Sequence, residues 1–212
     1  MKTNLPFDTH VSEYEEWFDE YPAVFKSEVE ALREMMPEGD KLTGIEVGLG
    51  TGRFSEALGI KEGVEPSENM RALAIKRGIE IIDGVAEQLP YGDMRFDFVL
   101  MVFCISYFDD LQVAFKEAHR VLKKNGVLVV GFLDRESTIG KEYEQRKATS
   151  IFYKSARFYS VDKVLSELKQ ARFRHFNFCQ TLFQSLNEIK ELEPCKIGYG
   201  EGSFVVIQAR KG

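Results

Sequence analysis

A dense group of glycines directly after a short apolar stretch constrains the fold of this chain more than any other feature. The segment 44–54 reads GIEVGLGTGRF and places Gly48, Gly50 and Gly52 at alternate positions. Glycines spaced this closely allow backbone with positive φ and the close approach of a ligand to the main chain. A strand is expected over 42–47 and a helix after Gly52, so the segment predicts a strand–loop–helix unit with a ligand at the loop.

Strand and helix signals alternate along the rest of the chain. Further strands are expected over 63–65, 79–82, 96–103, 127–133, 173–183 and 203–209, and further helices over 67–76, 110–124 and from residue 160 onward. Near-continuous apolar runs such as 96–103 are typical of parallel strands buried on both faces. The alternation therefore predicts an α/β protein with a doubly wound, Rossmann-like sheet and helices on both faces.

The end of the chain departs from this alternation. Only the irregular segment 184–202 separates the last two expected strands, whereas parallel neighbours need a crossover connection, usually a helix. We therefore expect a mostly parallel sheet with an antiparallel last strand. The length of 212 residues suits one such domain with a small appendage.

Charge and cysteine usage disfavour several classes of protein. The chain carries 28 Lys and Arg against 34 Asp and Glu, a net charge of −6, whereas a nucleic-acid surface normally needs a basic face. Its three cysteines are scattered without a Cys-x-x-Cys pair, which predicts a reducing compartment and neither a disulfide framework nor a zinc site. The longest apolar run, 98–105, is too short to span a bilayer, and the N-terminus lacks the apolar core of a signal peptide. We expect a soluble cytoplasmic protein with no metal, no nucleic-acid partner and no membrane partner.

The spacing of the glycines disfavours a phosphate ligand. A dinucleotide fingerprint needs a third glycine where Arg53 stands, and a Walker loop needs Lys and Ser or Thr after its last glycine, where Arg53 and Phe54 follow Gly52. The loop is therefore expected to bind a nucleoside without a pyrophosphate.

Five sequence motifs follow one another between residues 44 and 133. They read Glu46-x-Gly48-x-Gly50-Thr51-Gly52, Val64-Glu65-Pro66-Ser67-x-x-Met70, Gly84-Val85-Ala86-Glu87-Gln88-Leu89-Pro90-Tyr91, Phe96-Asp97-Phe98-Val99 and Glu117-x-x-Arg120-Val121-Leu122-Lys123-x-x-Gly126. In this order they resemble the motifs of class I S-adenosylmethionine-dependent methyltransferases, of the small-molecule type similar to the ubiquinone-biosynthesis methyltransferases. The resemblance implies an enzyme with S-adenosylmethionine as cofactor, S-adenosylhomocysteine as product and a methyltransferase domain over 41–212.

The resemblance also implies a set of cofactor contacts. Glu65, at the end of the second strand, would accept hydrogen bonds from the two ribose hydroxyls, and its alternative is a solvated loop acid. Glu46 would bind the ammonium group of the cofactor directly or through water, and its alternative is a charge partner for a helix terminus. The expected cofactor-binding residues are Tyr14, Trp17, Glu46, Gly48, Leu49, Gly50, Gly52, Glu65, Pro66, Met70, Val85, Ala86, Glu87 and Phe103.

One position departs from the family pattern. Relatives often carry Asp where Val85 stands, and that Asp bonds the adenine amino group. A valine side chain has no hydrogen-bonding group. Backbone groups around Ala86 or the Glu87 side chain are expected to hold the adenine instead.

Acceptor contacts are expected from three segments. Residues 1–40 would form an N-terminal helical lid, because Tyr14-Glu15-Glu16-Trp17-Phe18 resembles the family's lid, although the spacing of its aromatic residues also fits a plain core helix. Tyr107 follows the fourth strand, where this family meets its substrate, or packs under the next helix. A cap-like insertion over 135–157 would select the acceptor. The expected substrate contacts are Tyr107, Tyr143, Arg146 and Tyr153.

The reaction expected from this pattern is an in-line methyl transfer to a small-molecule acceptor, in which the protein acts mainly by positioning. We assign no general base: His119 is expected to be structural and His175 exposed, while His10, just before the lid helix, is the one histidine that could reach the pocket. The sequence Asn-Pro-Pro-Tyr, which marks relatives acting on nucleic-acid bases and glutamine side chains, is absent. One alternative is a regulatory or partner protein that binds the cofactor without turnover. The other is a nicotinamide oxidoreductase, which the glycine spacing and the late pair of strands disfavour.

Overall fold

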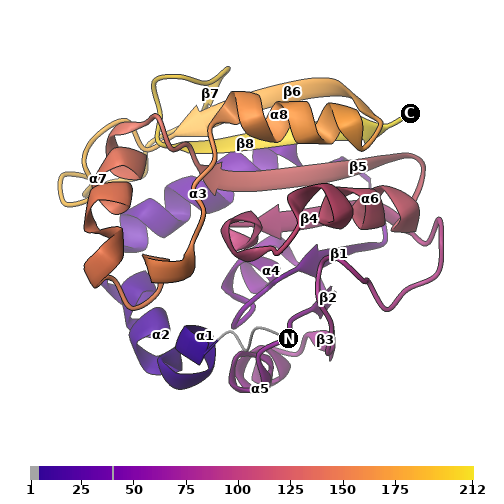
Figure 1. Cartoon of the computed structure of the whole chain (residues 1–212), viewed down its shortest axis with the longest axis horizontal. Helices are drawn as coiled ribbons and strands as arrows, with labels where there is room; N and C mark the ends of the chain where they lie inside the picture. The colour runs from indigo at the N-terminus through magenta and orange to yellow at the C-terminus, as the bar shows by residue number, and fades with distance from the viewer. Residues whose placement is uncertain (1–4, 40) are drawn as a thin grey trace.

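An eight-stranded sheet in the order β3-β2-β1-β4-β5-β8-β6-β7 runs through the part of the chain that the computed structural model describes, residues 5–39 and 41–212 (Figure 1). Residues 1–4 and 40 of the expected lid lie outside the described residues. The strands are β1 (Gly44–Val47), β2 (Glu62–Val64), β3 (Glu80–Ile82), β4 (Phe96–Val102), β5 (Leu122–Leu133), β6 (Phe173–Thr181), β7 (Lys196–Ile197) and β8 (Phe204–Lys211).

The sheet is parallel from β3 to β5, and β8 lies antiparallel between β5 and β6. The predicted doubly wound sheet with an antiparallel last strand is therefore confirmed. The short β7, which was not predicted, pairs antiparallel with the outer edge of β6.

Helices cover both faces of this sheet (Figure 1). They are α1 (Leu5–Thr9), α2 (Val11–Glu20), α3 (Pro22–Met35), α4 (Arg53–Leu58), α5 (Glu68–Lys76), α6 (Leu111–Val121), α7 (Thr138–Arg146) and α8 (Val161–Gln170), with 3-10 turns at Cys104–Tyr107, Lys147–Thr149 and Tyr153–Ser155. None of the helices in the described residues is long and apolar enough to cross a membrane.

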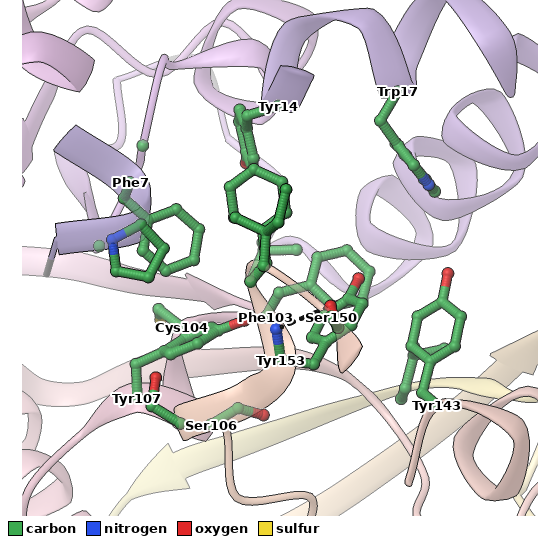
Figure 2. Close-up of a pocket in the computed structure, with 18 of the residues that line it drawn as sticks. Phe7, Tyr14, Trp17, Phe103, Cys104, Ser106, Tyr107, Tyr143, Ser150 and Tyr153 are labelled. Carbon is green, nitrogen blue, oxygen red and sulfur yellow. Dashed lines mark hydrogen bonds between the residues drawn. The ribbon is translucent and has the colours of Figure 1, made fainter. Parts of the chain in front are cut away.

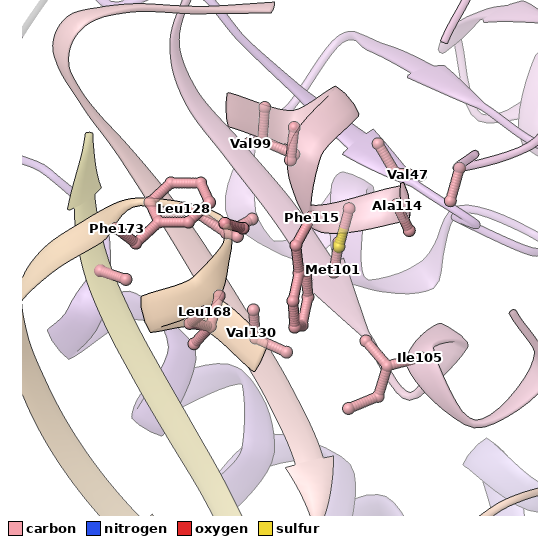
Figure 3. Close-up of a cluster of buried hydrophobic side chains, with 14 of the residues drawn as sticks. Val47, Val99, Met101, Ile105, Ala114, Phe115, Leu128, Val130, Leu168 and Phe173 are labelled. Atoms are coloured by element: carbon pink, nitrogen blue, oxygen red, sulfur yellow. The ribbon is translucent and has the colours of Figure 1, made fainter. Parts of the chain in front are cut away.

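Two apolar clusters form because neighbouring side chains of a buried strand point to opposite faces. Val99 and Met101 of β4 pack with Phe115 of α6 on one face, as Figure 3 shows. Leu100 and Val102 join the other cluster, which contains Leu32 of α3. This arrangement explains why the sequence of β4 is almost continuously apolar.

The predicted helix over 110–124 was wrong at its end. Helix α6 stops at Val121, and Leu122 is already extended, with φ of −70° and ψ of 139°. Leu122 pairs with Phe96 of β4, so strand pairing outweighs the local helix signal there. Asn125 adopts a left-handed φ of 64°, but it lies inside strand β5. The Asn-Gly pair therefore does not end the helix as the sequence had suggested.

The carboxyl ends of the parallel strands share one edge of the sheet. In Figure 1 the arrows of β4 and β5 point toward the side on which α2 and α7 lie. Segment 135–157, which the sequence left without a clear element, folds there as α7 and two 3-10 turns. The Ser137 hydroxyl begins α7 by accepting a hydrogen bond from the Gly140 N–H at 3.0 Å.

Candidate active site

A cavity of about 1190 Å³ lies at this edge of the sheet. Its floor includes residues that directly follow parallel strands: Gly48 after β1, Glu65 after β2 and Phe103 after β4. Its roof consists of side chains from α1, α2, α7 and the turns that follow α7. A ligand site at the carboxyl ends of the strands is the expected position for a doubly wound sheet.

The glycine loop between β1 and α4 forms one wall of the cavity. Gly48 and Gly50, which both line it, adopt φ of 68° and 57°. A Cβ on Gly48 would lie 2.6 Å from Cys104 Cβ, and a Cβ on Gly50 would lie 3.3 Å from the Tyr14 hydroxyl. Both positions therefore need glycine for the backbone conformation and for the space that the neighbouring side chains occupy.

Leu49 and Gly52 belong to the loop but do not line the cavity. Leu49 is buried with Ala74 and Ile79 in a small apolar cluster. A Cβ on Gly52 would lie 2.5 Å from Ile79 Cδ1. These two residues pack the loop against α5, and their expected contacts with the cofactor remain predictions.

Glu65 presents a buried carboxylate to the cavity. Its Oε2 accepts a hydrogen bond from the Gly50 N–H and its Oε1 accepts one from the Ser67 N–H, each at 2.9 Å. Burial raises the pKa of Glu65, against the effect of the two amides. The alternative of a solvated loop acid is wrong, because Glu65 is only 4% exposed. Each oxygen can accept a second hydrogen bond from a ligand, since a carboxylate oxygen has two lone pairs.

Glu46, on β1, is also buried but is not part of the cavity lining. Its Oε2 accepts a hydrogen bond from the Ser55 hydroxyl at the start of α4. Burial raises the pKa of Glu46 to about 8, and the nearby charge of Glu65 adds to this increase, while the bonds from Ser55 oppose it. A cation at this end of the cavity would favour the ionised form of Glu46.

The five residues expected near the adenine all line the cavity: Pro66, Met70, Val85, Ala86 and Glu87. Glu87 is engaged within the protein, because its Oε1 accepts hydrogen bonds from the Asp109 N–H at 2.7 Å and the Asp110 N–H at 3.3 Å. The Val85 residue is 42% exposed, whereas Met70 is completely buried. Pro66, Met70 and Val85 therefore give this part of the cavity an apolar wall that could contact a flat ring. The Glu87 carboxylate is used within the protein, where it holds the segment before α6.

Helix α2 is attached to the glycine loop by one acidic side chain. Glu15 Oε1 accepts a hydrogen bond from the Thr51 hydroxyl, and Oε2 pairs with Arg53 Nη2 at 2.8 Å and Arg77 Nη2 at 2.6 Å. Burial raises the pKa of Glu15, but the bonds from Arg53, Thr51 and Arg77 outweigh it and hold the pKa below its usual value. The roof helix α2 is thus held to the glycine loop and to Arg77 by hydrogen bonds and ion pairs outside the cavity lining.

We expect Glu15→Gln to loosen this attachment by about 1–2 kcal/mol, because bonds between charged groups are lost at a partly buried site. Amide hydrogen exchange over α2 should become faster, and S-adenosylhomocysteine should bind more weakly. Glu16→Gln, at an exposed neighbouring position of the same helix, is the matched control and should change neither quantity. Equal exchange rates in the two variants would contradict the anchoring role of Glu15.

Tyr14, Trp17 and Phe18 of α2 all line the cavity, and Phe18 is also buried in the core. The helix therefore acts both as a core element and as part of the roof. Figure 2 shows Tyr14 between Phe7 and Tyr107 on one side and Trp17 and Tyr143 on the other. Phe7 contacts Tyr107 edge to face, with ring centroids 4.9 Å apart.

All four residues expected to contact the acceptor line the cavity: Tyr107, Tyr143, Arg146 and Tyr153. The rings of Tyr143 and Tyr153 stack, with centroids 4.6 Å apart. Burial is the main cause that raises the pKa of Tyr143 to about 12, so its hydroxyl stays protonated at neutral pH. These aromatic side chains line the same cavity as the glycine loop.

Phe103 directly follows β4 in a left-handed conformation, with φ of 58°. Its N–H donates to the Gly131 carbonyl at 2.8 Å, and its ring packs against Phe54 and Phe204. A bulky side chain rarely adopts this conformation, so β5 and the core hold the backbone in it. Phe103 thereby sets the direction in which the chain leaves β4 and enters the 3-10 turn that contains Tyr107.

Sequence reasoning missed two acidic residues, Glu15 and Glu28. Glu28 lines the cavity although it is only 1% exposed. A signal was present, because Glu28 lies four residues from both Val24 and Leu32 in the apolar stripe of α3. No histidine of the described residues lines the cavity, so His10, which could have reached it, does not do so in this structure.

Comparisons with known proteins point to methyltransferases, as the sequence motifs do. A family model for the methyltransferase domain matches residues 45–130. A Thermotoga maritima crystal structure, described as a SAM-dependent methyltransferase and possible histamine N-methyltransferase, is 48% identical, covers 98% of both chains and has a TM-score of 0.94. An uncharacterised protein of Methanocaldococcus jannaschii is 42% identical over 205 residues, which are 97% of this chain and 98% of the relative. The demethylmenaquinone methyltransferase of Staphylococcus carnosus is 37% identical over 76 residues, 36% of this chain and 29% of that protein.

A glycine loop and a buried carboxylate at the carboxyl ends of a doubly wound sheet define a nucleoside-binding α/β enzyme. The comparisons show to which family of such proteins the chain belongs. The chain belongs to the class I S-adenosylmethionine-dependent methyltransferases, and S-adenosylmethionine is its cofactor.

Proposed function

We propose that this enzyme transfers the methyl group of S-adenosylmethionine to a small-molecule acceptor bound in the same cavity. The observation that carries this proposal is the extent of the cavity, which reaches from Gly48 and Glu65 to Tyr143 and Tyr153. Its volume of about 1190 Å³ exceeds the range of roughly 300–1,000 Å³ usual for one ligand. It therefore has room for a nucleoside cofactor and a small acceptor side by side.

The residues at one end of the cavity fit the cofactor. The Glu65 carboxylate, oriented by the amides of Gly50 and Ser67, would accept hydrogen bonds from the ribose hydroxyls. Met70 and Pro66 offer an apolar wall for the adenine. Glu46, behind the glycine loop, would compensate the ammonium charge of the amino-acid part.

The reaction requires positioning more than acid–base chemistry. When bound, the cofactor supplies a sulfonium methyl carbon, which a lone pair of the acceptor attacks while the C–S bond breaks and its electron pair returns to sulfur. The protein would contribute by holding the acceptor in line and by excluding water. Residues 1–40 as a lid and 135–157 as a cap would provide this enclosure, since Tyr14, Trp17, Tyr143 and Tyr153 come from these two segments.

The proposal is tested by calorimetry and by methyl transfer. S-Adenosylhomocysteine should bind the purified protein, whereas NAD, titrated in parallel, should not. The Thermotoga protein is described as a possible histamine N-methyltransferase, so small nitrogen compounds are the first acceptors to assay with methyl-labelled S-adenosylmethionine. Binding without label transfer to any of a broad set of amines, phenols, thiols and acids would favour the regulatory alternative.

Cofactor binding should release protons through Glu46. Its pKa of about 8 leaves the carboxyl largely protonated at pH 6.5. An ammonium group close to it lowers that pKa, so a proton leaves on binding and the affinity rises with pH up to about 8. Calorimetry of S-adenosylhomocysteine in two buffers with different ionisation enthalpies measures this release.

Adenosine, which lacks the ammonium group, is the matched ligand control for this prediction. It should release fewer protons than S-adenosylhomocysteine, and the difference between the ligands should disappear in Glu46→Gln. An equal difference in that variant would assign the released proton to another group.

A further inference from the structure

Glu28 is a buried acid that lines the cavity without a compensating partner for one of its oxygens. It lies in the middle of α3, it is 1% exposed, and its Oε2 has no hydrogen-bond partner in the described part of the chain. The preceding residue, Ser27, behaves differently: its hydroxyl donates to the Ala23 carbonyl and accepts from the Glu193 N–H. The hydroxyl of Ser27 therefore has hydrogen-bond partners within the protein, whereas Oε2 of Glu28, which lines the cavity, has none among the described residues.

An unpaired buried carboxyl is unfavourable for the folded protein. Burial of such a group without hydrogen bonds costs free energy, and native structures contain few examples that lack a functional reason. Burial raises the pKa of Glu28 well above its usual value. A cationic ligand that donated hydrogen bonds to Oε2 would remove this penalty.

Aromatic side chains line the same cavity as Glu28, among them Trp17, Tyr143 and Tyr153. Glu28 lies close enough to Tyr143 and Tyr153 for its negative charge to raise the pKa of both phenols, whose largest shift comes from burial. In Figure 2 the Tyr143 hydroxyl points toward Trp17 of α2. The faces of Trp and Tyr rings attract ammonium groups, by about 0.5–2 kcal/mol for each contact.

Acidic side chains outnumber basic ones along the whole cavity lining. Six acidic residues line the cavity within the described ranges, against three basic ones: Glu13, Glu20, Glu28, Glu65, Glu87 and Asp109 against Arg146, Lys154 and Arg157. An anionic acceptor would meet this excess of negative charge, while a cationic acceptor would be attracted by it.

We propose that Glu28 and the rings of Trp17, Tyr143 and Tyr153 form the acceptor-recognition subsite of the enzyme, and that it binds the ammonium group of a small organic amine with an apolar body. This inference rests on the proposed function and specifies its acceptor class. Glu28 accepts the hydrogen bonds of the ammonium group, which serves for recognition because a protonated nitrogen has no lone pair for attack on the methyl carbon. The stacked tyrosines contact the apolar part, and another atom of the acceptor carries the attacking lone pair.

The test compares ligands that differ only in charge, on protein saturated with S-adenosylhomocysteine. The probes are 2-phenylethylamine against 2-phenylethanol, and hexylamine against hexanol. At least one amine should bind the wild-type protein about tenfold or more tightly than its alcohol, which is about 1.4 kcal/mol. Amines that bind no better than their alcohols would overturn the proposal without any variant.

Variants then assign the preference to one side chain. Glu28→Gln keeps the size of the side chain and should abolish the preference for the amine, while the affinity for the alcohol and for S-adenosylhomocysteine stays the same. Glu34→Gln, at an exposed position of the same helix, should retain the preference in full. A preference that survives in Glu28→Gln would show that Glu28 has only a structural role.

The two proposals fail in different ways. If S-adenosylhomocysteine does not bind the wild-type protein, the proposed function fails. If it binds and the amines show no preference, the proposed function stands and the amine subsite is withdrawn.

Discussion

Replacing Glu65 by alanine is expected to weaken S-adenosylhomocysteine binding by about a hundredfold or more. Each hydrogen bond to a charged group contributes about 1.5–3 kcal/mol, and two ribose hydroxyls are expected to donate to this carboxylate. The amides of Gly50 and Ser67 would also lose their acceptor, so the glycine loop would be held less firmly. Titration calorimetry of the wild type and the variant measures the effect.

Ligand and protein controls make the assignment specific. Removal of a ribose hydroxyl, by comparing adenosine with 2′-deoxyadenosine, should weaken binding to the wild type and make little difference to Glu65→Ala. Glu62→Ala, at the opposite end of the same strand, removes a carboxylate that pairs with Arg95 and should leave the affinity unchanged. Equal sensitivity to the missing hydroxyl in wild type and Glu65→Ala would exclude Glu65 as the ribose acceptor.

Gly48→Ala is expected to lower the free energy of unfolding by about 2–5 kcal/mol and to abolish tight cofactor binding. A left-handed conformation costs a residue with a Cβ about 1–2 kcal/mol, and overpacking adds about 1–3 kcal/mol. The added methyl would lie 2.6 Å from Cys104 Cβ, which is attached to the backbone and has little freedom to move. Urea unfolding and cofactor titration give the two quantities.

The chain offers a matched control for the steric part of this effect. Gly59 ends α4 with a similar φ of 75°, but no atom lies within 4 Å of a Cβ built there. Gly59→Ala should therefore show the conformational strain alone, about 1–2 kcal/mol, and unchanged cofactor affinity. If both variants lost the same stability and affinity, the contact with Cys104 would not explain the role of Gly48.

The cofactor half of the site was largely predictable because its residues are contiguous in short motifs. Gly48 and Gly50 lie in one segment with β1, and Glu65, Pro66 and Met70 lie in one segment with β2. Each segment has a local residue pattern that can be recognised without the rest of the chain. Both segments follow parallel strands and so end at the same edge of the sheet. The roles of these residues toward the cofactor remain predictions until the titrations above are made.

The part of the cavity that is proposed to hold the acceptor was predictable only in outline. The sequence pointed to Tyr143, Arg146 and Tyr153 as cap residues, and the structure brings all three into the cavity lining. It did not indicate Glu28, because an acidic residue in a helix is usually exposed. It also did not indicate Glu15, whose partners Arg53 and Arg77 lie 38 and 62 residues further along the chain.

The sequence by itself determined the alternation of strands and helices apart from α7 and β7, the doubly wound sheet, the glycine loop and, through five motifs, the cofactor class. These features depend on periodicity and backbone conformation within short segments, which local residue patterns encode. Only the tertiary structure decided where helix α6 ends, how Glu15 attaches α2 to the glycine loop and that Glu28 lines the same cavity as Tyr143 and Tyr153. Those features depend on contacts between residues far apart in the chain, and such contacts leave no regular trace in the sequence.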